Sequence, residues 1–165
     1  MVIKDTRIRT AIFILLVTGA LFGVLFVRST NNMHQEPQPS NLNSKYADAV
    51  LRGAKAPISV SIADTEAERE QGLSGTPSLP MHTGKFFIFE SSGPEGFWMK
   101  DMRYPLDLVW IDSALHVVGV TARVDPSTYP TVFYAPSDVQ YVLEVNAGDA
   151  EVLGITDGLK FTLEK

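Results

Sequence analysis

A run of seventeen uncharged, mostly apolar residues near the N-terminus restricts what this chain can fold into more than any other feature. Residues 11–27 read AIFILLVTGALFGVLFV and lie between a basic N-terminus and Arg28. A helix of this length spans roughly 25 Å, close to the ~30 Å hydrocarbon thickness of a bilayer. Arg9 and Arg28 can extend their charged ends to the two interfaces and make up the difference. We therefore expect a single transmembrane helix over residues 11–27.

The charges that flank this run indicate its orientation. Lys4, Arg7 and Arg9 precede it, and only Asp5 opposes them. Positive flanks stay on the cytoplasmic side, so we expect residues 1–10 in the cytoplasm and the rest of the chain beyond the inner membrane. A cleaved secretory signal is the alternative, although its apolar core is usually about 7–15 residues long. Cleavage would give a secreted domain, so both interpretations place that domain outside the cytoplasm.

The sequence after the apolar run falls into two parts. Residues 28–56 are polar, contain prolines and lack a sustained hydrophobic period, so we expect a flexible linker with at most one helical turn at residues 46–51. From residue 57 onward, short apolar runs alternate with Gly, Pro, Asp and Ser. Residues 57–165 are enough for one domain with a hydrophobic core. Because the chain has no cysteine, that core must be stable without disulfides or thiolate-bound metal.

The two parts carry charge of opposite sign. Residues 1–56 hold seven Lys or Arg against three Asp or Glu, a net charge of +4, whereas residues 57–165 hold seven against sixteen, a net charge of −9. An acidic domain repels nucleic-acid phosphates and anionic membrane surfaces. We therefore expect no nucleic-acid partner, and membrane contact only through residues 11–27.

The pattern of residues 57–165 predicts a mainly β domain. Residues 58–63 (ISVSIA) alternate and are rich in β-branched side chains, as is typical of a strand. Further strands are expected at residues 85–89, 97–99, 106–111, 117–122, 139–145 and 160–163. Seven short strands at this spacing predict a compact sandwich or barrel.

Two short helices should interrupt these strands. Thr65 and Glu68 form the pattern of a capping box, and Gly72 supplies a stop, which together predict a helix at residues 66–71. A second helix is expected at residues 149–153, with Asn146 as its cap.

Several motifs of this domain resemble those of a known family. Residues 97–102 (FWMKDM), followed by Pro105-Leu106-Asp107, are similar to the family signature FWMK-(N/D)-x-x-x-P-(L/I)-D. The segments EREQGL, GKFFIF and VLEVNAG agree with further family segments in the same order. Residues 57–165 thus resemble the prokaryotic domain-of-unknown-function family 192, also called the uncharacterised UPF0127 group. The resemblance implies a compact, mostly β fold that is often exported or membrane-tethered, and it implies no particular activity.

Asp107 is the first candidate functional residue. In a strand at residues 106–111 its side chain shares a face with two apolar residues, so a carboxylate stands at the head of an apolar row. Such a group needs hydrogen-bond donors or has a raised pKa. Asp107 either acts in a pocket, as an acid or base or a ligand contact, or accepts hydrogen bonds from backbone N–H groups after Pro105, or pairs with Arg103 or Arg69.

The signature motif supplies three more candidates. Trp98, Lys100 and Asp101 combine an aromatic ring, a cation and a carboxylate, and with Asp107 they form a set that suits the lining of a polar-ligand cleft. The alternative is that Trp98 is a large core residue with a hydrogen-bonded indole N–H.

Glu144 and Asn146 complete the set of candidate ligand-binding residues. Glu144 paired with Asp107 would give a two-carboxylate hydrolase site. A Glu on such a strand also suits a solvated face or an ion pair, and Asn146 also suits the role of helix cap.

No pattern predicts a metal site, a cofactor or an activated nucleophile. The three histidines are scattered without the spacing of histidine ligands, and the acidic residues lack the register of a calcium loop. There is no cysteine, no G-x-S-x-G motif and no phosphate-binding glycine loop. We therefore expect neither a metal nor a cofactor.

These observations favour a membrane-tethered binding or accessory module outside the cytoplasm. Its partner would be a polar small molecule, a glycan or a protein. The alternative is a hydrolase or carbohydrate-processing enzyme that uses Asp107 with Glu144 or Asp101, with Lys100 as electrostatic support. That alternative requires these groups to converge in a concave pocket near Trp98.

Overall fold

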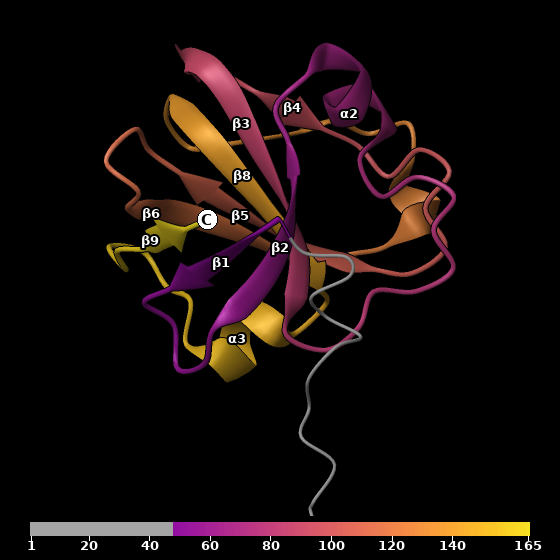
Figure 1. The fold of residues 1–165 in the computed structure, drawn as a ribbon. Helices are drawn as coiled ribbons and strands as arrows, with labels where there is room; N and C mark the ends of the chain where they lie inside the picture. Colours follow the sequence, from indigo (N-terminus) through magenta and orange to yellow (C-terminus); the bar gives the residue numbers. More distant parts are fainter. Residues whose placement is uncertain (1–47) are drawn as a thin grey trace, which may run out of the picture. The chain divides into compact units, whose positions relative to one another are not determined.

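One seven-stranded sheet organises residues 48–165, the part of the chain that the computed structural model describes (Figure 1). The strand order is β6-β5-β8-β3-β2-β1-β9; β2 and β3 are parallel, and all other neighbours are antiparallel. The strands are β1 (Ala49–Arg52), β2 (Ile58–Ala63), β3 (Thr83–Gly93), β5 (Leu106–Ile111), β6 (Val117–Val124), β8 (Val139–Asn146) and β9 (Thr162–Glu164).

Smaller elements complete the fold. Strands β4 (Gly96–Phe97) and β7 (Phe133–Tyr134) form a separate two-stranded sheet. The helices are α2 (Glu66–Gln71), α3 (Asp149–Leu153) and the single 3-10 turn η1 (Pro126–Thr128). The domain is therefore mainly β with two short α-helices in its described part, as the sequence predicts.

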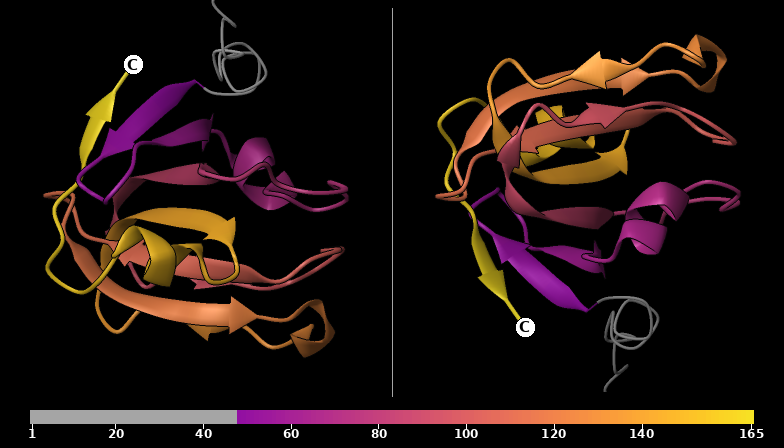
Figure 2. Two further views of the ribbon diagram at one scale, coloured as in Figure 1. Left: turned by 90° about the horizontal axis from the view of Figure 1, so that it is seen from below. Right: turned by 90° about the horizontal axis from the view of Figure 1, so that it is seen from above.

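The large sheet curls until its two ends approach each other (Figure 2). The N–H of Val117, the first residue of β6, donates to the carbonyl of Leu159 at 2.8 Å, and the Val117 carbonyl accepts from Gly158 at 2.8 Å. A bridge between His116 and Lys160 lies beside these bonds. The segment before β9 thus connects to the start of β6, which gives the sheet a barrel-like curvature.

Both faces of the sheet bury apolar side chains because successive strand residues point to opposite sides. One cluster includes Phe86, Val109 and Leu143 and packs against α3 through Ala150 and Leu153. The cluster on the other face includes Phe87, Leu108, Trp110 and Val142, and residues from loops cover it, among them Leu73, Leu79, Met99 and Tyr104. No residue of α2 is buried, so loops rather than a helix cover most of the second face.

The folded domain begins earlier than the sequence pattern predicts. Strand β1 lies within the expected linker at residues 28–56 and overlaps the expected helical turn at residues 46–51. Its side chains alternate between buried and more exposed, Leu51 is fully buried, and it pairs with both β2 and β9. A strand of four residues within a polar stretch is too short for its alternating pattern to be recognised in the sequence. The expected membrane helix at residues 11–27 lies outside the described residues, and within residues 48–165 no helix is long and apolar enough to cross a membrane.

The two helices have the predicted bounds, but only one has the predicted cap. Thr65 Oγ1 accepts from the Glu68 N–H at 3.3 Å, and Glu68 Oε2 accepts from the Thr65 N–H at 3.1 Å, so the capping box of α2 is present. The cap of α3 is Gly148 in a left-handed conformation, without a side-chain hydrogen bond of its own. The prediction for Asn146 is wrong because its Nδ2 instead donates to the carbonyl of Leu79 at 3.0 Å.

Candidate functional site

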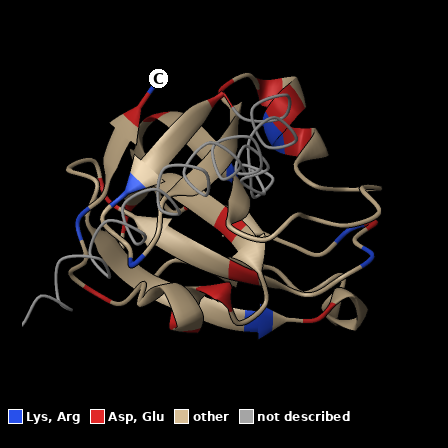
Figure 3. Cartoon of the chain, turned by 60° about the horizontal axis from the view of Figure 1, so that its bottom comes forward, with Lys and Arg blue, Asp and Glu red and all other residues tan. Residues whose placement is uncertain are grey.

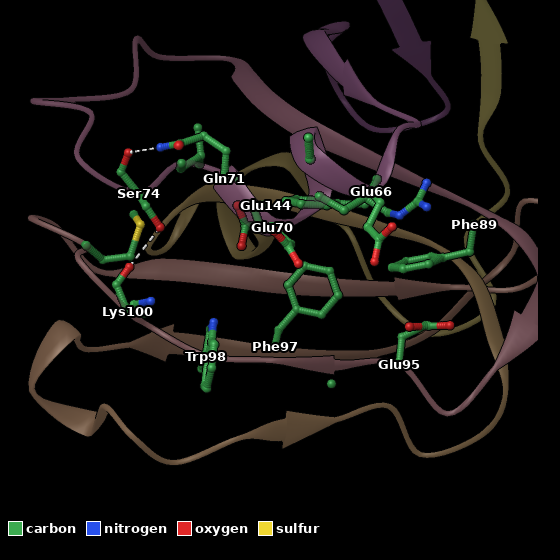
Figure 4. Close-up of a pocket in the computed structure, with 17 residues that line it drawn as sticks. Glu66, Glu70, Gln71, Ser74, Phe89, Glu95, Phe97, Trp98, Lys100 and Glu144 are labelled. Carbon is green, nitrogen blue, oxygen red and sulfur yellow. Dashed lines mark hydrogen bonds between the residues drawn. The ribbon is translucent and has the colours of Figure 1, made fainter.

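A cleft of about 680 Å³ opens on the second face of the sheet, beside α2 (Figure 4). Its lining comes from α2 and the turn after it, from β3 and β8, and from the segment between residues 95 and 102. The aromatic residues of the lining are Phe87, Phe89, Phe97 and Trp98, and the ionisable ones are Glu66, Arg69, Glu70, Glu95, Lys100 and Glu144. The cleft therefore combines aromatic rings with several carboxyl groups.

Two hydrogen bonds fix one end of the cleft. Gln71 Nε2, at the end of α2, donates to the carbonyl of Ser74 at 2.8 Å. Ser74 Oγ then donates to the carbonyl of Lys100 at 2.9 Å (Figure 4). These bonds join the wall formed by α2 to the wall formed by the signature motif, two segments that are distant in sequence.

Glu144 is the buried polar group of this cleft. Its side chain is on the same face as Leu108 of β5 and Lys85 of β3, its neighbours in the two ladders, and the residue is only 6% exposed. Its Oε2 is buried and has no hydrogen-bond partner among the described residues, and no ion pair between described residues includes Glu144. Burial raises the pKa of Glu144 to about 8, although the positive charge of Lys85 opposes the shift. At neutral pH the carboxyl is therefore mostly protonated.

The pKa of Tyr104 is shifted by burial and by the neighbouring Glu144. Burial raises the pKa of Tyr104, the hydrogen bond with Thr76 opposes that shift, and the negative charge of Glu144 adds to it. The Tyr104 hydroxyl lies 2.7 Å from Thr76 Oγ1. Tyr104 therefore stays protonated at neutral pH and has its own partner, so it does not satisfy Glu144.

Trp98 stands at the rim rather than in the core. It is 50% exposed, and its ring meets that of Tyr129 edge-on with centroids 5.7 Å apart. Lys100 Nζ lies 5.9 Å from the Trp98 ring centroid. Of the two roles that the sequence allows, the structure thus places Trp98 in the cleft lining, with a cation over its ring.

The charges of α2 border the same cleft. The helix is mostly acidic (Figure 3), and both Glu66 and Glu70 are exposed. Its one cation, Arg69, donates through Nη1 to the carbonyls of Asp64 and Ile88 and lies 5.4 Å over the Phe89 ring. The guanidinium of Arg69 is therefore already held by two backbone carbonyls and an aromatic ring.

Asp107 has a different location from the one that a catalytic pair requires. Asp107 pairs with Val145 in the β5–β8 ladder and the next residue, Leu108, pairs with Glu144, so the two carboxyl groups point to opposite faces of the sheet. Asp107 is fully buried. Its Oδ1 accepts from the Arg123 N–H at 2.7 Å, and its Oδ2 accepts from Gly148 at 2.9 Å and Ala150 at 3.0 Å. Asp107 therefore accepts hydrogen bonds from backbone N–H groups, which is one of the predicted roles. The donors belong to β6 and to the start of α3, and not to the turn after Pro105.

The six predicted ligand-binding candidates thus separate into two groups. The cleft brings together Trp98, Lys100 and Glu144. Asp107 and Asn146 make the internal hydrogen bonds described above. Asp101 lies in an adjoining hollow of about 580 Å³ that also includes Lys100, and its carbonyl accepts from the Gly75 N–H at 2.9 Å.

Sequence reasoning did not identify the aromatic residues Phe87 and Phe89 or the acidic residues Glu66 and Glu70 of α2 as part of the cleft. Phe87 and Phe89 share a face of β3 with Lys85, a period-2 signal that was present in the sequence. Their contact with the cleft of Glu144 depends on the β3–β8 register, which no local pattern reveals. No group of three or more His, Asp or Glu within residues 48–165 is arranged to hold a metal ion.

Comparison with protein families agrees with the motifs. The profile of the DUF192 family, described as Uncharacterized ACR, matches residues 48–163. The chain belongs to this family. The match includes β1, in agreement with the earlier start of the folded domain.

Two solved structures are similar to this chain. A putative transcription regulator from Sinorhizobium meliloti is 28% identical with a TM-score of 0.67, over 72% of this chain and 95% of that one. A protein of unknown function from Novosphingobium aromaticivorans is 28% identical with a TM-score of 0.63, over 69% of this chain and 82% of that one. No curated protein matches the chain.

Proposed function

We propose that the chain is a binding module outside the cytoplasm, tethered to the inner membrane by residues 11–27, and that the cleft beside α2 holds a polar small molecule or the end of a glycan. The observation that carries this proposal is Glu144, a residue of the cleft lining whose buried Oε2 has no partner in the described residues. Native proteins pair nearly all their buried polar atoms. A ligand that hydrogen-bonds to Glu144 would remove the cost of leaving this one unpaired.

The rest of the lining supports a small polar ligand. Trp98 presents half of its surface at the rim. Within the lining, the rings of Phe87 and Phe97 meet edge-on with their centroids 4.8 Å apart. Aromatic surface with a few polar groups is typical of ligand sites, and the volume of about 680 Å³ lies in their usual range.

Other functions receive less support. The hydrolase alternative loses its Asp107–Glu144 pair because the two carboxyl groups face opposite sides of the sheet. A role in transcription, the description of the S. meliloti relative, finds no support in residues 57–165, which hold seven basic and sixteen acidic residues.

The tether is tested by topology reporters. Alkaline phosphatase fused after Lys165 should be active, and a fluorescent protein that matures only in the cytoplasm should remain dark at the same position. The reverse pattern would disprove the proposed orientation. Recovery of the intact chain in the soluble fraction would disprove the anchor.

The cleft is tested by a thermal-shift screen of polar metabolites and oligosaccharides on the full chain in detergent micelles. A compound that raises the Tm of the wild type should have no effect on Trp98→Ala and should retain its effect on Val152→Ala, an exposed apolar position on α3 outside the cleft. If every stabilising compound acts equally on Trp98→Ala, the ligand does not bind in this cleft.

A further inference from the structure

We infer that the ligand of this cleft carries a primary ammonium group, which binds to the Glu144 carboxylate and releases the carboxyl proton to solvent. This inference rests on the proposed binding function of the cleft. It adds the chemical class of the ligand and a measurable proton stoichiometry.

The first support is the missing donor. Oε2 of Glu144 is buried without a partner, and Lys85, its neighbour across the β3–β8 ladder, forms no ion pair with it. The cleft therefore holds an acceptor that no donor of the described residues satisfies. A primary ammonium group carries three N–H donors and a positive charge, so it can satisfy this oxygen with a charge-assisted hydrogen bond.

The second support is that the aromatic rings of this cleft already attract cations. Arg69 lies 5.4 Å over the Phe89 ring, and Lys100 Nζ lies 5.9 Å from the Trp98 ring. Both distances are within the range of cation–π attraction. Phe87 and Phe97 line the same cleft and have no cation over them in the described residues. Phe87 is buried, so the half-buried Phe97 is the ring that can offer the same attraction to a cation of the ligand.

The third support is the balance of charge in the lining. The charged and titratable groups around Glu144, from every element that borders it, are Lys85 on β3, Tyr104 before β5, Glu66, Arg69 and Glu70 on α2, Glu95 before β4, and Lys100 after it. With Lys85 included, three exposed or half-buried carboxylates are balanced by three cations while Glu144 is protonated. Ionisation of Glu144 would leave a net negative charge, and a bound ammonium group would cancel it.

The proton balance follows from these groups. In the empty cleft burial raises the pKa of Glu144 to about 8, so the carboxyl is about nine-tenths protonated at pH 7. A cation in contact with the carboxyl favours its charged form and lowers its pKa. The ammonium group keeps its own proton, Glu144 loses one, and an N–H···O⁻ hydrogen bond forms. Affinity should therefore rise about tenfold per pH unit below pH 8.

The test is isothermal titration calorimetry on the full chain in detergent micelles, with 1,4-diaminobutane as the probe. Titrations at pH 7 in two buffers with different ionisation enthalpies give the number of protons released. We expect about 0.9 protons per bound diamine in the wild type. Glu144→Gln should release none and bind at least tenfold more weakly. Glu90→Gln, the same change at an exposed position of β3 outside the cleft, should behave as the wild type.

Two further probes separate the contributions of charge and hydrogen bonding. 1,4-Butanediol has the same length without the charge, and choline has a charge without ammonium N–H donors; both should bind at least tenfold more weakly than the diamine. Circular dichroism of Glu144→Gln checks the fold, which should persist because Gln has nearly the shape of a protonated Glu.

The two levels of the proposal fail in different ways. If a polyol or sugar binds without proton release, and Trp98→Ala abolishes this binding, the cleft is a binding site but the ammonium assignment is wrong. If the diamine produces no binding heat at 10 mM, on the order of the weakest affinities that matter for a small-molecule site, the assignment is also wrong. If no compound of the thermal-shift screen depends on Trp98, the binding function itself fails.

Discussion

Two buried carboxyl groups lie on opposite faces of the same pair of strands and have opposite surroundings. Asp107 accepts three backbone N–H bonds, whereas Oε2 of Glu144 accepts none from the described residues. Burial is similar for both, at 0% and 6% exposure. The number of internal partners, rather than the degree of burial, therefore distinguishes an acid that holds the fold together from an acid that the described residues leave unsatisfied.

The Asp107 face also shows how a helix is capped from a distance. Asp107 Oδ2 accepts hydrogen bonds from two N–H groups that lie 41 and 43 residues further along the chain, at the start of α3. On the other face, α2 is capped within its own sequence by Thr65 and Glu68. One helix thus depends on the tertiary fold for its first turn, and the other depends on its own residues.

The largest effect should come from removing the satisfied acid. Asp107→Ala leaves the N–H groups of Arg123, Gly148 and Ala150 without their acceptor and should lower the free energy of unfolding by about 3 kcal/mol. Urea denaturation followed by circular dichroism measures this change. Asp138→Ala, at an exposed position, should change stability by less than about 0.5 kcal/mol. Equal losses in the two variants would contradict the structural role of Asp107.

The second effect is a pH dependence of the free energy of unfolding, caused by Glu144. The pKa of Glu144 is about 8 in the folded protein and near 4.5 in an exposed chain, so between these values the native state holds a proton that the unfolded state has lost. The stabilisation from this proton is complete below pH 4.5 and disappears as the pH rises through 8. Relative to Glu144→Gln, the wild type should therefore lose up to about 1.4 kcal/mol per pH unit over this interval.

Urea denaturation of both proteins at pH 5, 6, 7 and 8 measures this difference. Glu90→Gln serves as the matched control, since it makes the same chemical change at an exposed site. A constant difference between wild type and Glu144→Gln across the series would show that Glu144 does not titrate as proposed.

A smaller effect is expected at the local cap of α2. Thr65→Ala removes the Oγ1 acceptor of the Glu68 N–H and should cost about 1 kcal/mol in chemical denaturation. Because α2 forms a wall of the cleft, binding of any cleft ligand should also weaken. Thr65→Ser retains the oxygen and should restore both properties. A Thr65→Ser variant as unstable as Thr65→Ala would exclude the hydrogen bond as the cause.

The smallest effect on stability is expected at the rim. Trp98→Ala removes a half-exposed ring and should change the free energy of unfolding by no more than about 0.5 kcal/mol while reducing ligand binding. Trp110→Ala, which removes a ring from the core, should instead cost about 3 kcal/mol or more. If the two tryptophan variants destabilise the protein equally, Trp98 is part of the core and not of a binding surface.

Local patterns in the sequence were sufficient for the elements that have strong local signals. Strands β2 and β5 and helices α2 and α3 have the predicted bounds. Alternation marks β2 and a capping box marks α2, whereas β5 is an apolar run and α3 has no side-chain cap. Strands β1 and β7 were missed, since four and two residues are too few to produce a clear period. Leu51 of β1 is buried only because β2 and β9 lie beside it, which is a long-range effect.

The site was predictable only in part for the same reason. Trp98, Lys100 and Glu144 could be selected by residue type, but their position beside α2 depends on long-range packing. The faces of Asp107 and Glu144 follow from parity within each strand, yet their relation to each other depends on the β5–β8 register. A shift of that register by one residue would have placed both acids on one face.

The pairing of β1 with β9 affects the order in which this protein can be completed. β1 is the first strand of the described domain, and β9 ends one residue before the last residue of the chain. During synthesis, the outer edge of β1 stays unpaired until residues 162–164 emerge. A nascent chain stopped before residue 162 would expose that edge to other polypeptides, so the sheet is protected only once its last strand has been made.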